Sequence, residues 1–234
     1  LLALGLCVVQ PLYFWPAFLI ASIWHFGAGD VEPGLAPRRW EQLEIWTRGA
    51  LPIAWPAAFH PEAVGDLFAM LTGPSTETVL GERIVWAGTR AAPWVAVALV
   101  AVCARHAWCG GRTGDRRHTS VVLEITALAL AGIALPPLLF FALYFCGWHS
   151  VRHALGLLET LGREASIRGL AQLARDALTP ALAPLIAGGV VMLGLAPGGL
   201  ERSALQVLFA GLAALAVPHM LLWFWVPVPP GGKS

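Results

Sequence analysis

Charged residues are scarce in this sequence. They make up 12% of its 234 residues, against roughly 25% in an ordinary soluble domain, and the mean hydropathy is +0.69. Most of the protein surface must therefore face something other than water, and this composition indicates a lipid bilayer. The net charge is only +1, so nothing in the charge balance predicts a nucleic-acid partner.

Cysteine patterns that bind metals or form disulfide frameworks are also missing. The four cysteines include no CxxC pair, which argues against a zinc knuckle and against a disulfide-stabilised fold. Tyrosine is rare, with two residues against eleven tryptophans, and many tryptophans lie near the ends of apolar runs, as in interfacial aromatic belts. No signal peptide and no internal repeat are visible, and because Leu1 already lies in an apolar run we expect at least one helix upstream of it.

Long apolar runs predict an all-α fold, a polytopic transmembrane bundle of about seven segments that forms one integral membrane domain over residues 1–234. A transmembrane helix needs about 20 mostly apolar residues. The expected segments are 11–27, 46–59, 87–108, a run over 119–158 that Pro136 and Pro137 divide into two, 180–195 and 203–226. The segment 46–59 is short and holds two prolines, so a kinked span and a re-entrant segment both remain open.

Arginines concentrate in the loops expected between these segments. The loop 110–118 is the most polar part of the chain, and basic loops mark the cytoplasmic side of a membrane. Alternation from this loop also places Arg38 and Arg39, the loop 159–176 and the C-terminus inside. We therefore expect a multi-pass protein of the cell (inner) membrane with a cytoplasmic C-terminus.

Two histidines four residues apart give the sharpest chemical signal. His149 and His153 would lie on one helix face about 6 Å apart along the axis, which is the geometry of two ligands to one metal ion. Unpaired imidazoles are costly inside a membrane, and a metal offsets that cost, although two hydrogen-bonded core histidines are the alternative. His106 and His118 lie beside arginines at the basic loop and are expected to be solvated.

Three more histidines are candidates for the same metal. His25 and His219 fall at a similar cytoplasmic depth on other segments, whereas His60 falls at the opposite face, where it resembles an interfacial cap. The nearest acidic residues, Asp30 and Glu124, lie near the ends of segments. The sequence therefore favours an all-imidazole site over a two-histidine, one-carboxylate iron site.

Two motifs around these histidines resemble the Brp/Blh family of bacterial and archaeal β-carotene 15,15′-dioxygenases. Residues 22–30 match the pattern S-x-x-H-F-G-x-x-D, and residues 144–153 match Y-F-x-x-W-H-S-x-R-H. Weaker similarities lie at residues 59–61 and 218–220. The resemblance covers nearly the whole chain from Pro11 onward.

The resemblance implies iron(II) held by four histidines, with O2 as co-substrate and β-carotene or a related carotenoid cut at its central double bond into two retinals. Of the motif residues, His25, His149 and His153 would be ligands, and His219 and His60 are weaker candidates. The family's remaining ligand lies in an upstream P-H-G-A-L-D-type motif, which this sequence does not contain.

The residues beside the expected ligands suggest further roles. A carotenoid site should be lined with aromatic side chains, although ordinary helix packing explains such residues too. The aromatic residues that flank the expected ligands are Trp24, Phe26, Tyr144, Phe145 and Trp148. Asp30 could accept the second N–H of His25 or of a neighbouring ligand. Arg152 could pair with Asp30 across the helices, unless both residues simply meet water.

Three other classes of membrane protein compete with this interpretation. A di-iron hydroxylase or desaturase would need several histidine boxes, and only one HxxxH occurs here. A haem protein could use paired histidines on different helices as axial ligands. A small-molecule or ion transporter would be expected to show inverted repeats.

Overall fold

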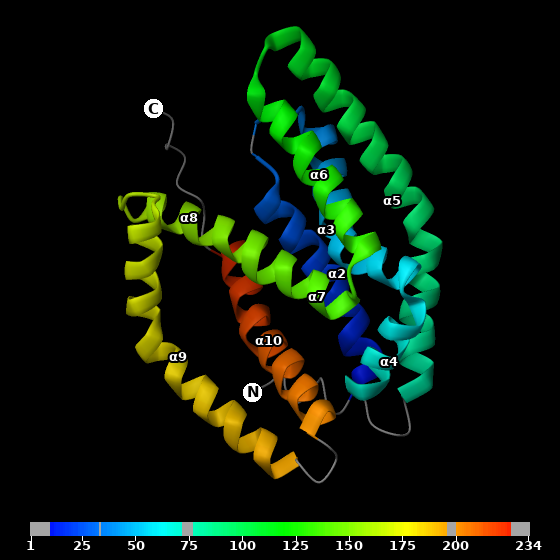
Figure 1. Ribbon diagram of the computed structural model, residues 1–234, viewed down its shortest axis with the longest axis vertical. Coiled ribbons are helices and arrows are strands. Elements are labelled where there is room, and N and C mark those ends of the chain that lie inside the picture. Colours follow the sequence, from blue (N-terminus) through cyan, green and yellow to red (C-terminus); the bar gives the residue numbers. More distant parts are fainter. Residues whose placement is uncertain (1–9, 33, 72–76, 196–199, 226–234) are drawn as a thin grey trace.

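The computed structural model describes residues 10–32, 34–71, 77–195 and 200–225 (Figure 1). Some side chains in the last two helices, including that of His219, lie outside the described residues, as does the apolar run 1–9. Every regular element in the described part is helical, which confirms the all-α fold class. In chain order the elements are α2 (Pro11–Asp30), α3 (Arg38–Phe59), α4 (Pro61–Leu71), α5 (Glu77–Thr113), α6 (Arg116–Ala134), α7 (Pro137–Ala142), the π-helix η1 (Leu143–His149), α8 (Ser150–Thr160), α9 (Ile167–Leu195) and α10 (Leu200–Trp225).

Helix α3 is the centre of the bundle and packs against α2, α5 and α6. It begins at Arg38, well before the apolar run expected from residue 46, and continues through Pro52 and Pro56 to Phe59. Of the polar residues before the run, Glu44 is buried and meets His106 of α5, whereas Arg38 and Arg39 are exposed. Segment 46–59 is thus part of one 22-residue helix and does not turn back on itself.

The backbones of helices α2 and α3 are in direct contact at two glycines, one on each helix. A Cβ atom on Gly27 would lie 1.8 Å from the carbonyl oxygen of Ile45, and one on Gly49 would lie 1.7 Å from that of Ile23. No side chain fits at either distance, so glycine is required at both positions. This close crossing explains the glycine of the HFG motif, and it fixes α2, which carries His25, against the central helix.

Gly27→Ala is expected to lower the stability of the protein markedly, because the added methyl group must push two backbones apart. Overpacking of this kind costs about 1–3 kcal/mol or more. The matched control is Gly156→Ala on α8, where a Cβ meets none of the described residues within 4 Å and helix propensity should instead favour alanine. Thermal unfolding in detergent measures both variants, and an unchanged melting temperature for Gly27→Ala would contradict the crossing.

The corner between α5 and α6 is much tighter than the expected loop 110–118. Helix α5 continues to Thr113 and α6 begins at Arg116, which leaves Gly114 with a φ of 72° and Asp115 as the N-cap of α6. Asp115 accepts hydrogen bonds from the side chain and the backbone N–H of Arg117, and these lower the pKa of its carboxyl group to about 2. The expected loop 159–176 is likewise shorter, because α9 begins at Ile167.

The double proline divides the run 119–158 as expected. Helix α6 ends at Ala134 and α7 begins at Pro137, a position where the missing N–H of proline costs nothing. From there the chain stays helical to Thr160, but residues 143–149 form a π-helix between α7 and α8. This oblique rod crosses the bundle beside α2 and leads to α9, which packs against α8 and α10 at the edge of the bundle (Figure 1).

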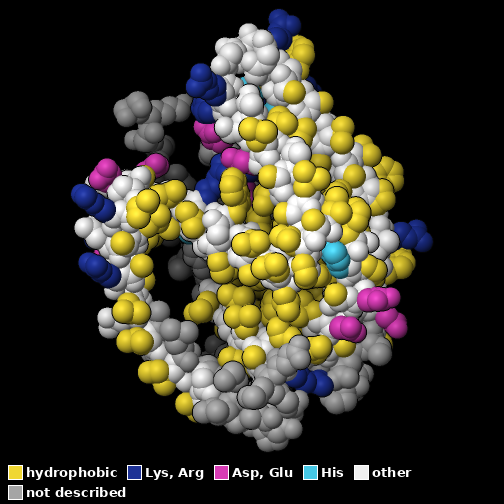
Figure 2. Space-filling model, viewed as in Figure 1, with side chains coloured by type: hydrophobic (Ala, Val, Ile, Leu, Met, Phe, Trp, Pro, Cys, Tyr) yellow, Lys and Arg dark blue, Asp and Glu magenta, His cyan; other side chains and the backbone are white. Residues whose placement is uncertain are grey.

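The outer surface of the bundle is apolar. On α5, the side chains of Trp94, Val97 and Val100 are 76%, 66% and 69% exposed. Hydrophobic side chains gather over much of the face formed by α5 and α6 (Figure 2). Two of the described helices are long and apolar enough to cross a membrane, Val79–Thr113 and Arg116–Ala134, and most of their residues are not buried. An exposed apolar surface of this extent indicates contact with lipid or with other protein.

Candidate metal centre

Three of the expected ligands lie together although they come from different parts of the chain. His25 is on the last turns of α2, His149 ends the π-helix and His153 lies on the first turn of α8. The ring centroids of His25 and His149 are 5.4 Å apart. Those of His149 and His153 are 6.3 Å apart, and their rings are nearly parallel, with 8° between the planes.

These distances are compatible with one metal ion. A metal–nitrogen bond of about 2.1 Å puts an imidazole centroid roughly 3.2 Å from the metal, so two ligands on one ion lie at most roughly 6.4 Å apart. Both observed separations fall within that limit, although no group of three metal-binding side chains among the described residues is already closed around a single point. The three imidazoles must rotate about their side-chain bonds before their nitrogens point at one metal ion. Neutral imidazoles suit iron, copper or zinc.

A buried carboxylate orients the middle histidine of the three. Asp30 is 1% exposed, and its Oδ1 lies 3.2 Å from Nδ1 of His149 while its Oδ2 accepts a 2.8 Å hydrogen bond from the Tyr144 hydroxyl. A neutral His149 that donates from Nδ1 keeps the lone pair of Nε2 available for a metal. This carboxylate–histidine arrangement is the usual support of a metal ligand.

Gly29, in the same motif as His25, leaves room for this contact. A Cβ atom there would lie 2.9 Å from Cε1 of His149, so any larger residue would press on the imidazole that Asp30 holds. The two motifs therefore meet through their own residues: Gly29 provides the space and Asp30 the hydrogen bond for His149.

An apolar cavity of about 420 Å³ lies beside the three histidines, and all three contribute to its wall. Most of the wall is hydrocarbon, and the only hydroxyl groups among the described lining residues belong to Ser22 and Ser150. The phenylalanines that line it are Phe18, Phe26, Phe68, Phe141, Phe145 and Phe209. A cavity of this kind accepts a hydrocarbon and places it against the imidazoles.

Comparison with known proteins decides the family. A sequence model described as beta-carotene 15,15'-dioxygenase matches residues 1–226. The chain belongs to the β-carotene 15,15′-dioxygenase family. It is 28% identical over 216 residues to a protein named beta-carotene 15,15'-dioxygenase from an uncultured marine bacterium, covering 91% of this chain and 71% of that protein.

A second relative comes from the archaeon Halobacterium salinarum. It is named probable beta-carotene 15,15'-dioxygenase Blh and is 30% identical over 237 residues, which cover 90% of this chain and 66% of the relative. No solved structure matches the chain. The family match confirms the resemblance given by the two motifs and makes the chain a carotenoid-cleaving dioxygenase.

The aromatic residues expected to contact substrate in this dioxygenase divide into two groups. Phe26 and Phe145 line the cavity, whereas Trp24, Tyr144 and Trp148 are not among its lining residues. Tyr144 is buried and directs its hydroxyl to Asp30, because a buried phenol needs a hydrogen-bond partner. Trp148 packs under the guanidinium of a neighbouring residue, with its ring centroid 5.8 Å from Cζ of Arg152.

The two weaker ligand candidates are His60 and His219. His60 follows the end of α3, and its Nε2 donates to the carbonyl oxygen of Ile133 at 3.0 Å. It is not among the residues that line the cavity, which fits the interfacial cap. The side chain of His219 lies outside the described residues, so its role stays a prediction.

The expectation that His106 and His118 are solvated is wrong. His106 is 0% exposed and His118 is 6% exposed, and their Nδ1 atoms lie 2.8 Å apart between α5 and α6. The other ring nitrogen of His106 lies 3.0 Å from Oε2 of Glu44 on α3. Sequence reasoning missed this cluster because Glu44 is 62 residues away from His106.

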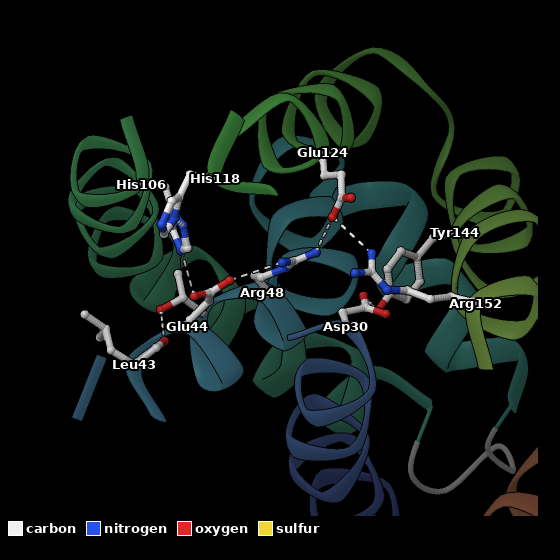
Figure 3. A network of polar contacts seen from close by, with 10 residues as sticks. Asp30, Leu43, Glu44, Arg48, His106, His118, Glu124, Tyr144 and Arg152 are labelled. Carbon is white, nitrogen blue, oxygen red and sulfur yellow. Dashed lines mark hydrogen bonds and ion pairs between the residues drawn. The ribbon is translucent and has the colours of Figure 1, made fainter. Parts of the chain in front are cut away.

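The predicted pairing of Arg152 with Asp30 is also wrong. Nη1 of Arg152 donates to Oε2 of Glu124 on α6 at 3.0 Å, as Figure 3 shows. The two carboxylate oxygens of Asp30 are already used by His149 and Tyr144. Arg152 of α8 therefore pairs with Glu124 of α6.

Proposed function

We propose that this chain cleaves the central double bond of β-carotene with O2, using one iron(II) ion that His25, His149 and His153 help to hold. The observation that carries the proposal is the placement of three imidazoles in the wall of one apolar cavity. The names of both relatives specify cleavage at the same 15,15′ bond. Iron(II), when bound there, would supply the activation of O2.

The chain's own residues position the polyene and keep the site dry. Phe26, Phe145 and Phe141 form an aromatic wall beside the histidines, and Phe141 stacks on Phe145 with 8° between their ring planes. A conjugated chain has a flat π-face that packs against such rings without needing a polar partner. The overall change breaks one carbon–carbon double bond, and each carbon receives one oxygen atom from O2, so no further oxidant or reductant is needed.

The cavity reaches the outer surface of the bundle. Its wall includes Leu157 of α8 and Leu215 of α10, which are 42% and 62% exposed. Because β-carotene dissolves in the hydrocarbon of a bilayer, a cavity with apolar residues at its rim would take the substrate from the membrane and return retinal to it.

Product analysis of the purified protein tests this function. Incubation with β-carotene under ¹⁸O2 is expected to give retinal as the only cleavage product, with ¹⁸O in both halves once exchange with water is corrected. An iron chelator should stop the reaction, and added iron(II) should restore it. Products of unequal chain length, or turnover that survives removal of the metal, would contradict the proposal.

We also propose that the bundle crosses the membrane about seven times, with the α5–α6 corner and the C-terminus in the cytoplasm. The support is the apolar outer surface and the basic residues near that corner (Figure 2). The rod of α7, η1 and α8, together with α2, α3, α5, α6, α9 and α10, supplies helical stretches of at least 19 residues. A stretch of that length spans roughly 28 Å, about the thickness of the hydrocarbon core.

Cysteine labelling of intact cells tests the orientation. In a background with all four native cysteines replaced by serine, Thr113→Cys at the α5–α6 corner should stay unlabelled by a membrane-impermeant maleimide. Glu62→Cys at the start of α4, near the opposite end of the bundle, should react (Figure 1). Labelling of Thr113→Cys from outside would reverse the proposed orientation.

A further inference from the structure

Arg152 lies in the same helical turn as two of the proposed metal ligands but does not face them. It follows His149 by three residues and precedes His153 by one. At about 100° per residue, its side chain leaves the helix roughly 60° from His149 and 100° from His153. A contact that holds this arginine therefore fixes the rotation of α8 about its own axis, and with it the direction of both imidazoles.

The partner of Arg152 is itself anchored in the core. Oε2 of Glu124 on α6 accepts from Nη1 of Arg152 at 3.0 Å and from Nη2 of Arg48 on α3 at 2.8 Å (Figure 3). Arg48 is 3% exposed, and its other terminal nitrogen, Nη1, donates to Oε1 of Glu44 at 3.1 Å. Charge-assisted bonds between a planar guanidinium and a carboxylate have restricted geometry. Three helices are thus joined through Glu124.

The segment before α8 is the π-helix η1, and it gives the Glu124–Arg152 contact a role in fixing the rotation of α8. Residues 143–149 form a π-helix, whose wider turns change the register between α7 and α8. The side chains of α8 therefore leave the rod in directions that differ from those a continuous α-helix from α7 would give. Polar contacts from other helices hold this region: Asp30 bonds with His149 and Tyr144, and Glu124 bonds with Arg152.

We propose that Glu124 and Arg152 are positioning residues for the metal centre, and that their ion pair sets the rotation of α8 so that His149 and His153 face His25. This inference rests on the proposed function. Neither residue touches metal or substrate in this role. The role predicts that breaking the pair weakens metal binding more than it weakens the fold.

Cobalt(II) binding to the purified metal-free protein tests the proposal without any turnover. Arg152→Gln is expected to raise the cobalt dissociation constant about 10–100-fold, the usual effect of losing a residue that supports a ligand. Arg152→Lys should recover part of this loss, because it keeps the charge but not the planar fork. Glu124→Gln should behave like Arg152→Gln, and hydrogen exchange of the α8 amides should become faster in both variants.

Glu32→Gln provides the matched control. It also removes a carboxylate that lies 3.0 Å from an arginine, Arg117 of α6, but Glu32 is in the loop after α2, and the pair is exposed and does not involve α8. Its cobalt affinity should equal that of the unchanged protein. Because Glu124→Gln leaves buried Arg48 with one carboxylate fewer, Arg152→Gln, which alters a side chain one-third exposed, decides the matter if the Glu124 variant fails to fold.

The possible outcomes distinguish a failure of the positioning role from a failure of the proposed metal centre. Unchanged cobalt affinity in Arg152→Gln, while His149→Ala loses the metal, would overturn the positioning role alone. Unchanged affinity in His149→Ala would instead overturn the proposed metal centre. Equal losses in Arg152→Gln and Arg152→Lys, accompanied by a matching fall in melting temperature, would show that the pair only stabilises the fold and would also overturn the proposal.

Discussion

Replacing His149 with alanine is expected to abolish both iron content and retinal formation. His149 is central among the three imidazoles, since it lies next to His25 in space and next to His153 along the helix. Its loss removes one metal bond and the residue that links the other two ligands. Iron per protein by elemental analysis and retinal by chromatography measure the two effects.

The variant also leaves a buried oxygen of Asp30 without its partner, which by itself costs about 1–3 kcal/mol of stability. His149→Gln separates the two effects, because a glutamine amide can still donate to Asp30 but is a poor metal ligand. We expect His149→Gln to fold nearly as well as the unchanged protein and yet to bind no iron. His153→Ala should lose iron as well, whereas His60→Ala should keep it, because His60 bonds to the Ile133 carbonyl. Near-normal turnover in His149→Ala would refute the assignment of the ligands.

The sequence alone predicted the relative placement of His149 and His153 well. The four-residue spacing predicted two imidazoles on one face about 6 Å apart, and the structure places their centroids 6.3 Å apart with parallel rings. The apolar runs located the helical rods, and the double proline located the break between α6 and α7. These features depend on neighbours within a few residues, so local spacing and composition are enough to find them.

Features that depend on distant partners could not be predicted in the same way. Polar residues at the start of α3 and the end of α5 suggested loops, yet both stretches are helical. There Glu44 meets His106, 62 residues away, and Arg48 meets Glu124, 76 residues away. A run of polar residues shows that a segment is not lipid-facing, but it does not show whether water or another helix satisfies those groups. The π-helix η1 also gave no signal in the sequence.

The role of the motif aspartate was predicted only in outline. Asp30 was expected to accept an N–H from His25 or from a neighbouring histidine, and the structure shows which histidine it contacts, because it places Oδ1 beside His149 and Oδ2 beside Tyr144. The choice depends on the close crossing of α2 and α3 and on the space left at Gly29. Both are properties of packing between helices that the spacing within the motif does not reveal.

Asp30→Asn is expected to lower iron affinity or turnover by roughly 10–100-fold without unfolding the protein. Asparagine has nearly the same shape, so its carbonyl oxygen can still accept from His149, and its amide group can donate to the Tyr144 hydroxyl once that hydroxyl acts as acceptor. What disappears is the negative charge that makes the imidazole a stronger ligand. Tyr144→Phe is the matched control, since it removes a partner of Asp30 but leaves the charge and the His149 contact in place. The tyrosine variant should therefore lose less iron affinity than Asp30→Asn while its melting temperature falls at least as far. If Asp30→Asn keeps full iron occupancy and full turnover, the carboxylate does not tune the ligand, and its contact with His149 serves only to fill a buried polar site.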